Sequence, residues 1–166
     1  MQVFPIARMS PLILGLTVLL LCLPVVFIGL GLSVPSPTST VLLGTGVFVV
    51  LLYASIWVYF RPSSYRVTPA EMTIVWPLRS RLVPRHDVAA ARVMELREFR
   101  AEYGHTIRIG AGGLFGTFGW LWSPRAGRLD VYVTNLGPWV VVERRAGRPL
   151  VLSPEDPHAF ARALQG

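Results

Sequence analysis

The glycine-rich stretch from Gly110 to Trp122, GAGGLFGTFGWLW, is where the residue types come nearest to a ligand-binding pattern. Glycine-rich loops bind phosphate groups when their backbone N–H groups, and the N-terminus of a following helix, face the ligand. The dinucleotide pattern G-x-G-x-x-G fails because Phe115 stands where its third glycine is needed, and a P-loop fails because the chain has no lysine. The residues that follow alternate as in a strand. We therefore expect the glycines to serve bends and close backbone approach, with Gly116 or Gly119 at positive φ.

Two large apolar residues, Leu114 and Phe115, lie between these glycines. They either pack beneath the folded domain or form an exposed apolar contact for the bilayer or a partner. We favour exposure, because glycine on both sides makes a rigid buried position hard to hold. On this hypothesis the substitution Phe115→Ser costs little stability.

Residues suited to catalysis, metal binding or cofactor binding are sparse. The three histidines are His86, His105 and His158. They are scattered and lack a local metal-ligand spacing such as H-x-x-x-H. The single cysteine, Cys22, lies in an apolar run, and no G-x-S-x-G motif is present. Glu155 and Asp156 are adjacent carboxylates, but a position in the first turn of a helix explains them. We expect no catalytic, metal or cofactor site and a non-enzymatic protein.

Two uncharged apolar runs dominate the N-terminal third of the chain, Leu12–Leu32 with 21 residues and Val41–Phe60 with 20. At about 1.5 Å of rise per residue, each run reaches across the ~30 Å hydrocarbon core of a bilayer as a helix. Two buried core helices would need a larger protein around them. A cleaved signal peptide is disfavoured for the first run, because a second run follows after eight residues. We predict two transmembrane helices joined by a short loop, residues 33–40.

The positions of the charges predict the orientation of these helices. All 16 basic residues are arginine; Arg8 precedes the first run, Arg61 follows the second, and the loop at 33–40 carries no charge. Positively charged flanks stay in the cytoplasm. We expect a short cytoplasmic N-terminus (1–11), an external loop and a cytoplasmic domain (61–166), on a multi-pass membrane protein.

The sequence from residue 61 onward changes to short alternating runs that are typical of strands. The clearest candidates are SYRVT, MTIVW, TFGWLW, RLDVYVT and WVVVER, whereas HDVAAARVMELREF fits either a strand or the start of a helix. The final SPEDPHAFARALQG fits an amphipathic helix with Ser153 as its N-cap and Phe160 on its buried face. We predict a mainly-β, partly open barrel of about seven strands with one C-terminal α-helix.

Two apolar runs followed by YRVTPAEMTIVWPL, and then by GTFG, YVTN and VVVERRAGRPLVLSPEDPHAFARAL, resemble the bacterial membrane proteins that carry a pleckstrin-homology-like (PH-like) domain. The likeness covers the whole chain in architecture and is sharpest over Gly116–Leu164. It implies a partly open barrel of two nearly orthogonal sheets with a C-terminal helix across one end, in a multi-pass protein of the bacterial inner membrane. It implies no catalytic or binding residues, so none is assigned from it.

Hairpin geometry places a first cluster of arginines beside the bilayer. Arg61 leaves the second apolar run, and the loop with Arg79 and Arg81 returns to the same level, with Arg85 as a further candidate. Each such arginine near an anionic leaflet is worth about 1 kcal/mol. We therefore expect charge reversal at Arg79 and Arg81 to weaken binding to anionic lipid. A solvated loop without lipid contact is the alternative.

A second cluster follows from two Arg-Ala-Gly-Arg turns, which fall at the same rim of an antiparallel meander. Its members are Arg125, Arg128, Arg144, Arg145 and Arg148. Arginine forks match phosphate and carboxylate groups, so binding of an acidic lipid headgroup or an acidic partner segment is one hypothesis. Ordinary surface charge is the other, since the chain uses arginine in place of lysine throughout.

The predicted function is a membrane-anchored, non-enzymatic interaction or assembly module, whose partners are the lipid bilayer and another membrane or membrane-associated protein. Two alternatives stay open. One is an anionic lipid-headgroup binder that acts through the arginines, and the other is a structural subunit of a larger membrane complex. Nucleic-acid binding is not expected, because the formal charge of +7 is modest and no recognition helix is evident.

Overall fold

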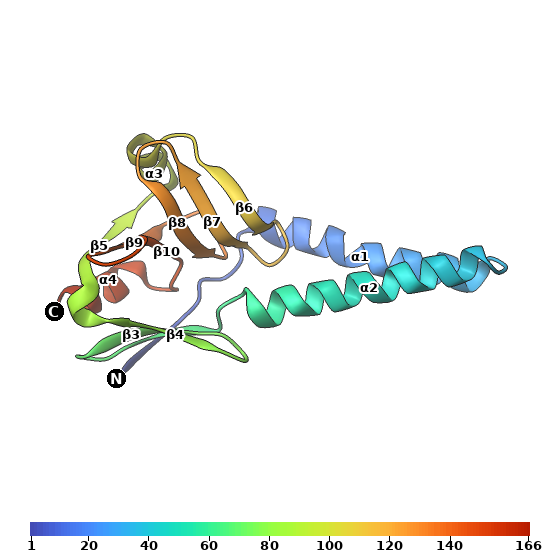
Figure 1. Cartoon of the computed structure of the whole chain (residues 1–166), viewed down its shortest axis with the longest axis horizontal. Helices are drawn as coiled ribbons and strands as arrows, with labels where there is room; N and C mark the ends of the chain where they lie inside the picture. The colour runs from blue at the N-terminus through green and yellow to red at the C-terminus, as the bar shows by residue number, and fades with distance from the viewer.

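Two long helices project as a hairpin from a β-rich domain in the computed structural model, which describes residues 1–166 apart from the Ala111 side chain (Figure 1). They are α1 (Pro11–Ser33) and α2 (Thr38–Tyr59), and each is long and apolar enough to cross a membrane. Only 17% and 6% of their most apolar windows are buried, whereas the core helices of a soluble protein are mostly buried. Their bounds lie within three residues of the predicted ones.

The first sheet contains a strand that comes from the N-terminus of the chain. Its strands are β1 (Gln2–Pro5), β2 (Ser64–Val67), β3 (Glu71–Val75) and β4 (Ser80–Pro84), antiparallel and in that order. In the β1–β2 pair, Gln2 lies opposite Val67 and Pro5 opposite Ser64. The helix hairpin is therefore an insertion between two neighbouring strands of one sheet. The N-terminal segment 1–11, which the sequence predicts as a separate cytoplasmic terminus, contains β1 and so forms part of the domain.

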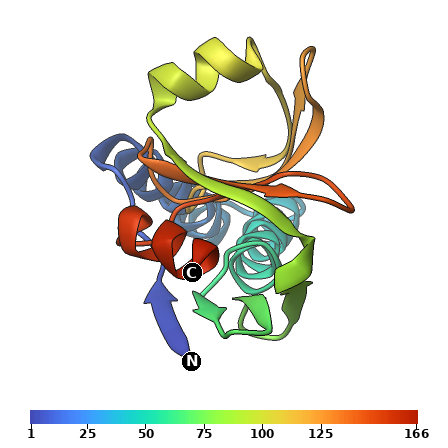
Figure 2. The same cartoon turned by 90° about the vertical axis from the view of Figure 1, so that its left-hand side faces the viewer.

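The second sheet has six strands and is flanked by two helices. The elements are β5 (Val88–Met94), β6 (Ile107–Gly112), β7 (Thr117–Ser123), β8 (Gly127–Val133), β9 (Trp139–Arg144), β10 (Leu150–Leu152), α3 (Leu96–Tyr103) and α4 (Pro157–Gln165), with a 3₁₀ turn at Arg85–Asp87 before β5. The strand order is β5-β9-β10-β8-β7-β6, and all pairs are antiparallel except β10 with β8. In Figure 2, α3 and α4 lie on opposite faces of this sheet.

The predicted fold class is confirmed: two apolar helices precede a domain of two sheets that ends in a helix. The strands number ten rather than about seven, because β1 joins from the N-terminus and the stretch expected to be a loop with Arg79 and Arg81 forms β4. The ambiguous segment HDVAAARVMELREF supplies both β5 and the first half of α3. The prediction of Ser153 as a helix N-cap is wrong. Helix α4 begins at Pro157, and Asp156 caps it by accepting a hydrogen bond from the Ala159 N–H at 2.8 Å.

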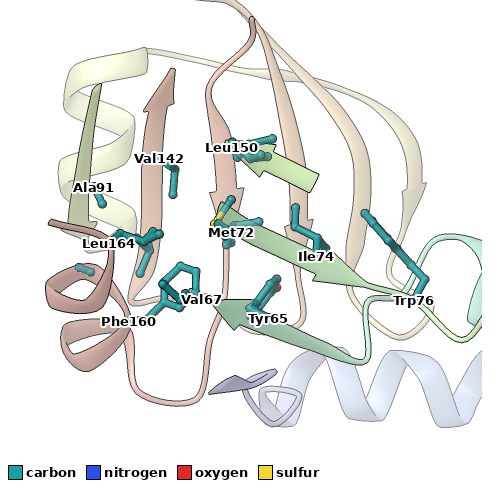
Figure 3. Packing of buried hydrophobic residues seen from close by; sticks show 14 residues of the cluster. Tyr65, Val67, Met72, Ile74, Trp76, Ala91, Val142, Leu150, Phe160 and Leu164 are labelled. Atoms are coloured by element: carbon teal, nitrogen blue, oxygen red, sulfur yellow. The ribbon is translucent and has the colours of Figure 1, made fainter. Parts of the chain in front are cut away.

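An inter-sheet core fills the space between the two sheets and α4. Figure 3 shows its buried side chains, which include Tyr65, Met72, Ile74, Trp76, Val142, Leu150, Phe160 and Leu164. Phe160 from α4 is fully buried and lies 5.5 Å from the Tyr65 ring, so the C-terminal helix closes this core as predicted. Phe4 of β1 packs edge-on against Phe160 at 5.2 Å, which brings the N-terminal strand into the same core.

An outer core lies on the opposite face of the six-stranded sheet, beneath α3. Phe99 of α3 stacks on Tyr103 at 4.7 Å and meets the edge of Trp139 at 5.2 Å. Leu121 and Val131 supply part of the sheet surface below them. A capping box between Glu95 and Glu98 begins α3, and the apolar side of this short helix fixes it to the sheet.

Candidate functional site at the junction of the domain and the helices

The turn between β6 and β7 packs against the helix hairpin through a buried hydroxyl group. Gly113 and Gly116 close the turn with a 2.9 Å backbone hydrogen bond. The Thr17 hydroxyl of α1 accepts a hydrogen bond from the Phe115 N–H at 3.0 Å and donates one to the Gly113 carbonyl at 3.2 Å. Thr17 is buried by this contact. One helix side chain thus satisfies two backbone groups of the turn.

The side chains at the tip of this turn are buried, with 4% of Leu114 and 8% of Phe115 exposed. The Phe115 ring meets the edge of Trp57 from α2 at 4.8 Å, and Leu20 and Tyr53 pack against the same cluster. The prediction of exposure is therefore wrong. The two residues pack against the helices, because residues about 60 to 100 positions earlier in the chain form a wall that the local pattern does not reveal.

The glycines of this stretch serve backbone geometry, as predicted. Gly116 has φ of 146° and Gly119 has φ of 123°, both in the left-handed region that favours glycine. An added Cβ at Gly119 would lie 2.6 Å from the Ile109 carbonyl oxygen, and one at Gly116 would overlap the Val133 carbonyl oxygen. Phe115 itself has φ of 61°, a conformation that non-glycine residues adopt rarely.

The segment between β1 and α1 is also tied to the domain. The Ala7 N–H donates to the Ser153 carbonyl at 2.8 Å, and the Ala7 carbonyl accepts from the Thr134 hydroxyl at 2.6 Å. The Ser153 hydroxyl accepts from the Thr134 N–H at 2.9 Å. These contacts explain why Ser153 does not cap a helix. They also fix the segment that precedes α1 to the domain.

Two of the predicted juxtamembrane arginines lie at the end of α2 that adjoins the domain. The Arg61 guanidinium stacks over the Trp57 ring at 4.2 Å, and Arg79 stacks over Trp76 at 4.6 Å. The Trp76 indole donates to the Phe60 carbonyl at 3.0 Å, which fixes the loop before Arg79 to the helix end. Burial lowers the pKa of Arg61. The structure therefore brings Arg61 and Arg79 to the same end of the hairpin.

The other two candidates of that cluster serve the fold. Arg81 forms a 2.7 Å ion pair with the buried Asp130 of β8 and so joins the two sheets. Burial alone would lower the pKa of Arg81, but the hydrogen bond and charge of Asp130 raise it. Arg85 donates to the Ala163 carbonyl of α4 at 2.6 Å, at the opposite end of the first sheet. The prediction that Arg85 joins the juxtamembrane cluster is wrong.

The second arginine cluster occupies one end of the six-stranded sheet, as the turn geometry predicts. The start of β8 and the start of β10 lie together because these strands are parallel, with Leu150 opposite Asp130. Both Arg-Ala-Gly-Arg turns therefore lie at that end, which is the end of β7 away from the helix-bound turn (Figure 1). Of the five arginines, only Arg145 has a side chain with no hydrogen-bond, ion-pair or stacking partner among the described residues.

The remaining four arginines of this cluster contact the domain itself. Arg144 pairs with Asp87 at 2.6 Å, and Arg148 lies 3.6 Å from Asp130. Arg125 donates to the Ala101 carbonyl near the end of α3, and Arg128 stacks over Trp120 at 3.9 Å. Binding of lipid headgroups or acidic partners by either cluster stays a prediction. Among the described residues, no three His, Cys, Asp or Glu side chains lie close enough to hold a metal ion.

The family model of the bacterial PH domain matches residues 63–166, well over half of the chain. The chain belongs to the bacterial PH domain family. The match begins after α2, so the PH domain of this chain includes one strand, β1, that lies outside the matched residues. No curated protein and no solved structure matches the chain. Family membership indicates a module for interaction with proteins or lipids.

Thr17 is the residue of this junction that sequence reasoning missed. It is the one hydroxyl residue in the run Leu12–Leu32, where every backbone group can be satisfied within the helix. A single threonine in such a run is a signal for a polar contact, but the sequence does not name its partner. Only the fold brings the PH domain turn at Gly113 to this threonine.

Proposed function

We propose that this protein is a membrane-anchored, non-enzymatic interaction and assembly module that presents its PH domain at the cytoplasmic surface of the bacterial inner membrane. The observation that carries the proposal is the double attachment of the PH domain to the helix hairpin. Strand β1, which precedes α1, pairs with β2, which follows α2. In addition, Thr17 of α1 forms hydrogen bonds with the β6–β7 turn. A domain held in this way has a fixed orientation relative to α1 and α2.

The orientation follows from the same attachment and from charge. Because the residues that flank both helices are hydrogen-bonded into one domain, the hairpin inserts with both of its ends on the same side. Arg8 and Arg61 flank the helices at that end, and the loop at 33–40 carries no charge. The positive-inside rule assigns such an end to the cytoplasm.

The β6–β7 hairpin of the PH domain carries an exposed apolar surface to which a partner protein can bind. The cross-strand pairs Ile107–Trp122 and Ile109–Trp120 are 42–60% exposed, although all four side chains are large and apolar. Exposed apolar patches of this kind mark contact surfaces. Anchoring both proteins in one membrane raises their effective concentration, so a weak contact suffices.

Site-specific photocrosslinking in native membranes tests the proposal. A photoreactive amino acid at position 109 or 122 of the full chain should give adducts with another membrane or membrane-associated protein, and the same residue at position 97 should not. A reporter fused after Gly166 should behave as cytoplasmic and one inserted at Ser36 as external. Lipid adducts alone at both patch positions, or the reverse topology, would contradict the proposal.

Anionic headgroup binding is the second candidate function, and the inner end of α2 favours it. Arg61 and Arg79 lie there beside two tryptophans, an arrangement that suits the headgroup region of a bilayer. Neither Arg61 nor Arg79 has a carboxylate within ion-pair distance among the described residues. The terminal nitrogens of both side chains can therefore pair with an acidic headgroup oxygen.

A further inference from the structure

A cleft of about 580 Å³ lies between α3 and the outer face of strands β6–β8. Its apolar wall is formed by residues of the outer core, among them Phe99, Leu121, Val131 and Trp139. The volume falls within the range of about 300–1,000 Å³ that is common for small-molecule sites. This cleft is on the opposite face of the sheet from the patch formed by Ile107, Ile109, Trp120 and Trp122.

The polar residues of the cleft are cationic or neutral. Arg100 from the end of α3, His105 from the following loop and Arg108 from β6 line it. The described side chains that line the cleft include no carboxylate. Among the described residues, neither Arg100 nor Arg108 has a carboxylate within ion-pair distance. Arg81 and Arg144, which the fold uses elsewhere, both have such a partner. The cleft is therefore complementary to an anion attached to an apolar body.

We propose that this cleft binds a single-chain anionic amphiphile, with a long-chain fatty acid as its simplest member. The carboxylate would pair with Arg100 and Arg108, and the alkyl chain would lie on the apolar wall. Thr117 lines the cleft and directly follows Gly116 of the turn that packs against α1. One end of the cleft thus lies beside the base of the helix hairpin. Supply of the amphiphile from the bilayer rests on the proposed membrane placement, whereas binding itself does not.

Photolabelling of the full chain in phosphatidylcholine nanodiscs tests the site, with a diazirine analogue of palmitic acid as the probe and peptide mass spectrometry as the readout. We expect adducts on peptides that contain Leu96–Arg108 or Trp139, besides labels on the helices from dissolved probe. The pair Arg100→Gln with Arg108→Gln should reduce the labelling of these peptides at least fivefold. The charge-matched pair Arg97→Gln with Arg145→Gln, which lies outside the cleft, should leave it unchanged.

Competition on the unmodified chain remains decisive if the double variant fails to fold. Unlabelled palmitic acid should displace the probe from the cleft peptides at a concentration at least tenfold lower than neutral hexadecanol. Labels confined to α1 and α2, equal competition by the acid and the alcohol, or undiminished labelling of a folded Arg100→Gln, Arg108→Gln variant would each overturn the proposal. Failure of the membrane placement would appear separately, as loss of the chain from the membrane fraction.

Discussion

The Thr17 hydroxyl of α1 and the Phe115 N–H of the β6–β7 turn form a buried hydrogen bond across 98 positions of the chain. The same hydroxyl donates to the Gly113 carbonyl. Both backbone groups lie at the tip of a turn and depend on this one side chain. The contact therefore joins the helix hairpin and the PH domain into a single structural unit. Removal of the contact tests whether the two parts stabilise each other.

Thr17→Val keeps the shape of the side chain but removes both hydrogen bonds. Leaving a buried donor or acceptor unsatisfied costs about 1–3 kcal/mol, so the thermal unfolding midpoint of the full chain in detergent should fall. The control is Thr45→Val in α2, because the Thr45 hydroxyl donates only to Val41 of its own helix and is exposed. Equal midpoints for the Thr17 variant and the parent would mean that the turn and α1 are not coupled.

Phe115→Ser should be clearly destabilising, contrary to the expectation from sequence. Truncation of a buried Phe to a small residue costs about 3–5 kcal/mol, and Phe115 packs on Trp57 with little exposure. The matched control is Ile109→Ser on β6, where half of the side chain is exposed. Chemical denaturation of both variants provides the comparison. If Phe115→Ser lowers the free energy of unfolding no more than Ile109→Ser does, the turn is loosely packed against the helices.

Local patterns were sufficient to predict the two apolar helices, most strands and the helix that carries Phe160. Each of these follows from hydropathy, periodicity or turn residues within about 20 positions. Strand β1 was missed because Gln2–Pro5 is short and its partner β2 lies beyond both helices. The Ser153 cap failed for a related reason, since the N-terminal segment at Ala7 occupies the backbone around it.

The candidate site was harder to predict than the fold, because arginine partners are set by long-range contacts. Turn geometry correctly predicts that Arg144 lies at the same end of the sheet as the other Arg-Ala-Gly-Arg turn. It could not show that Asp87 holds Arg144, or that Asp130 holds Arg81, since each carboxylate lies tens of residues away in sequence. Spacing identifies where a charge lies, whereas the fold decides whether that charge is already paired.

Removal of β1 should expose the edge of β2 and weaken the inter-sheet core. A chain in which a Gly/Ser linker replaces residues 10–61 retains β1, whereas a fragment that begins at residue 61 lacks it together with the Phe4–Phe160 contact. We expect the linked version to unfold at a higher temperature and to protect more amide hydrogens in β2 from exchange. Identical exchange of β2 in both would show that β1 adds no stability.

Asp87 should make stability depend on pH at the acidic end. The Ala146 N–H donates to this carboxylate at 2.6 Å and Arg144 pairs with it, and these contacts lower the pKa of Asp87 below its ordinary value. A depressed pKa contributes stability above the pKa of the unfolded chain, about 3.9, and that contribution is lost as the pH falls through the folded pKa. Asp87→Asn should thus melt below the parent at pH 7.

The difference between Asp87→Asn and the parent should shrink as the pH is lowered into the range where Asp87 is protonated. The exposed Glu155→Gln variant is the control and should show little difference at either pH. Melting curves between pH 3 and pH 7 provide the measurement. A gap that stays constant over that range would mean that the charge of Asp87 does not contribute to the stability.

Arg61 and Arg79 should make the full chain respond to anionic lipid, if the second candidate function holds. The sequence suggested a test at Arg79 and Arg81, but Arg81 is paired with Asp130, so its reversal would damage the fold. Arg61→Gln with Arg79→Gln removes two charges near the inner end of α2 without breaking an ion pair.

Nanodiscs of phosphatidylcholine, with and without phosphatidylglycerol, allow the comparison within one full chain. The parent should gain thermal stability from the anionic lipid at low salt, with a smaller gain at high salt because ions screen the attraction. The Arg61, Arg79 variant should lose most of that gain, whereas Arg125→Gln with Arg145→Gln, at the far end of the six-stranded sheet, should retain it. Each arginine near an anionic surface is worth about 1 kcal/mol, which is enough to separate the two pairs. Equal gains for both variants would assign the lipid response to the helices and leave the arginines as ordinary surface charge.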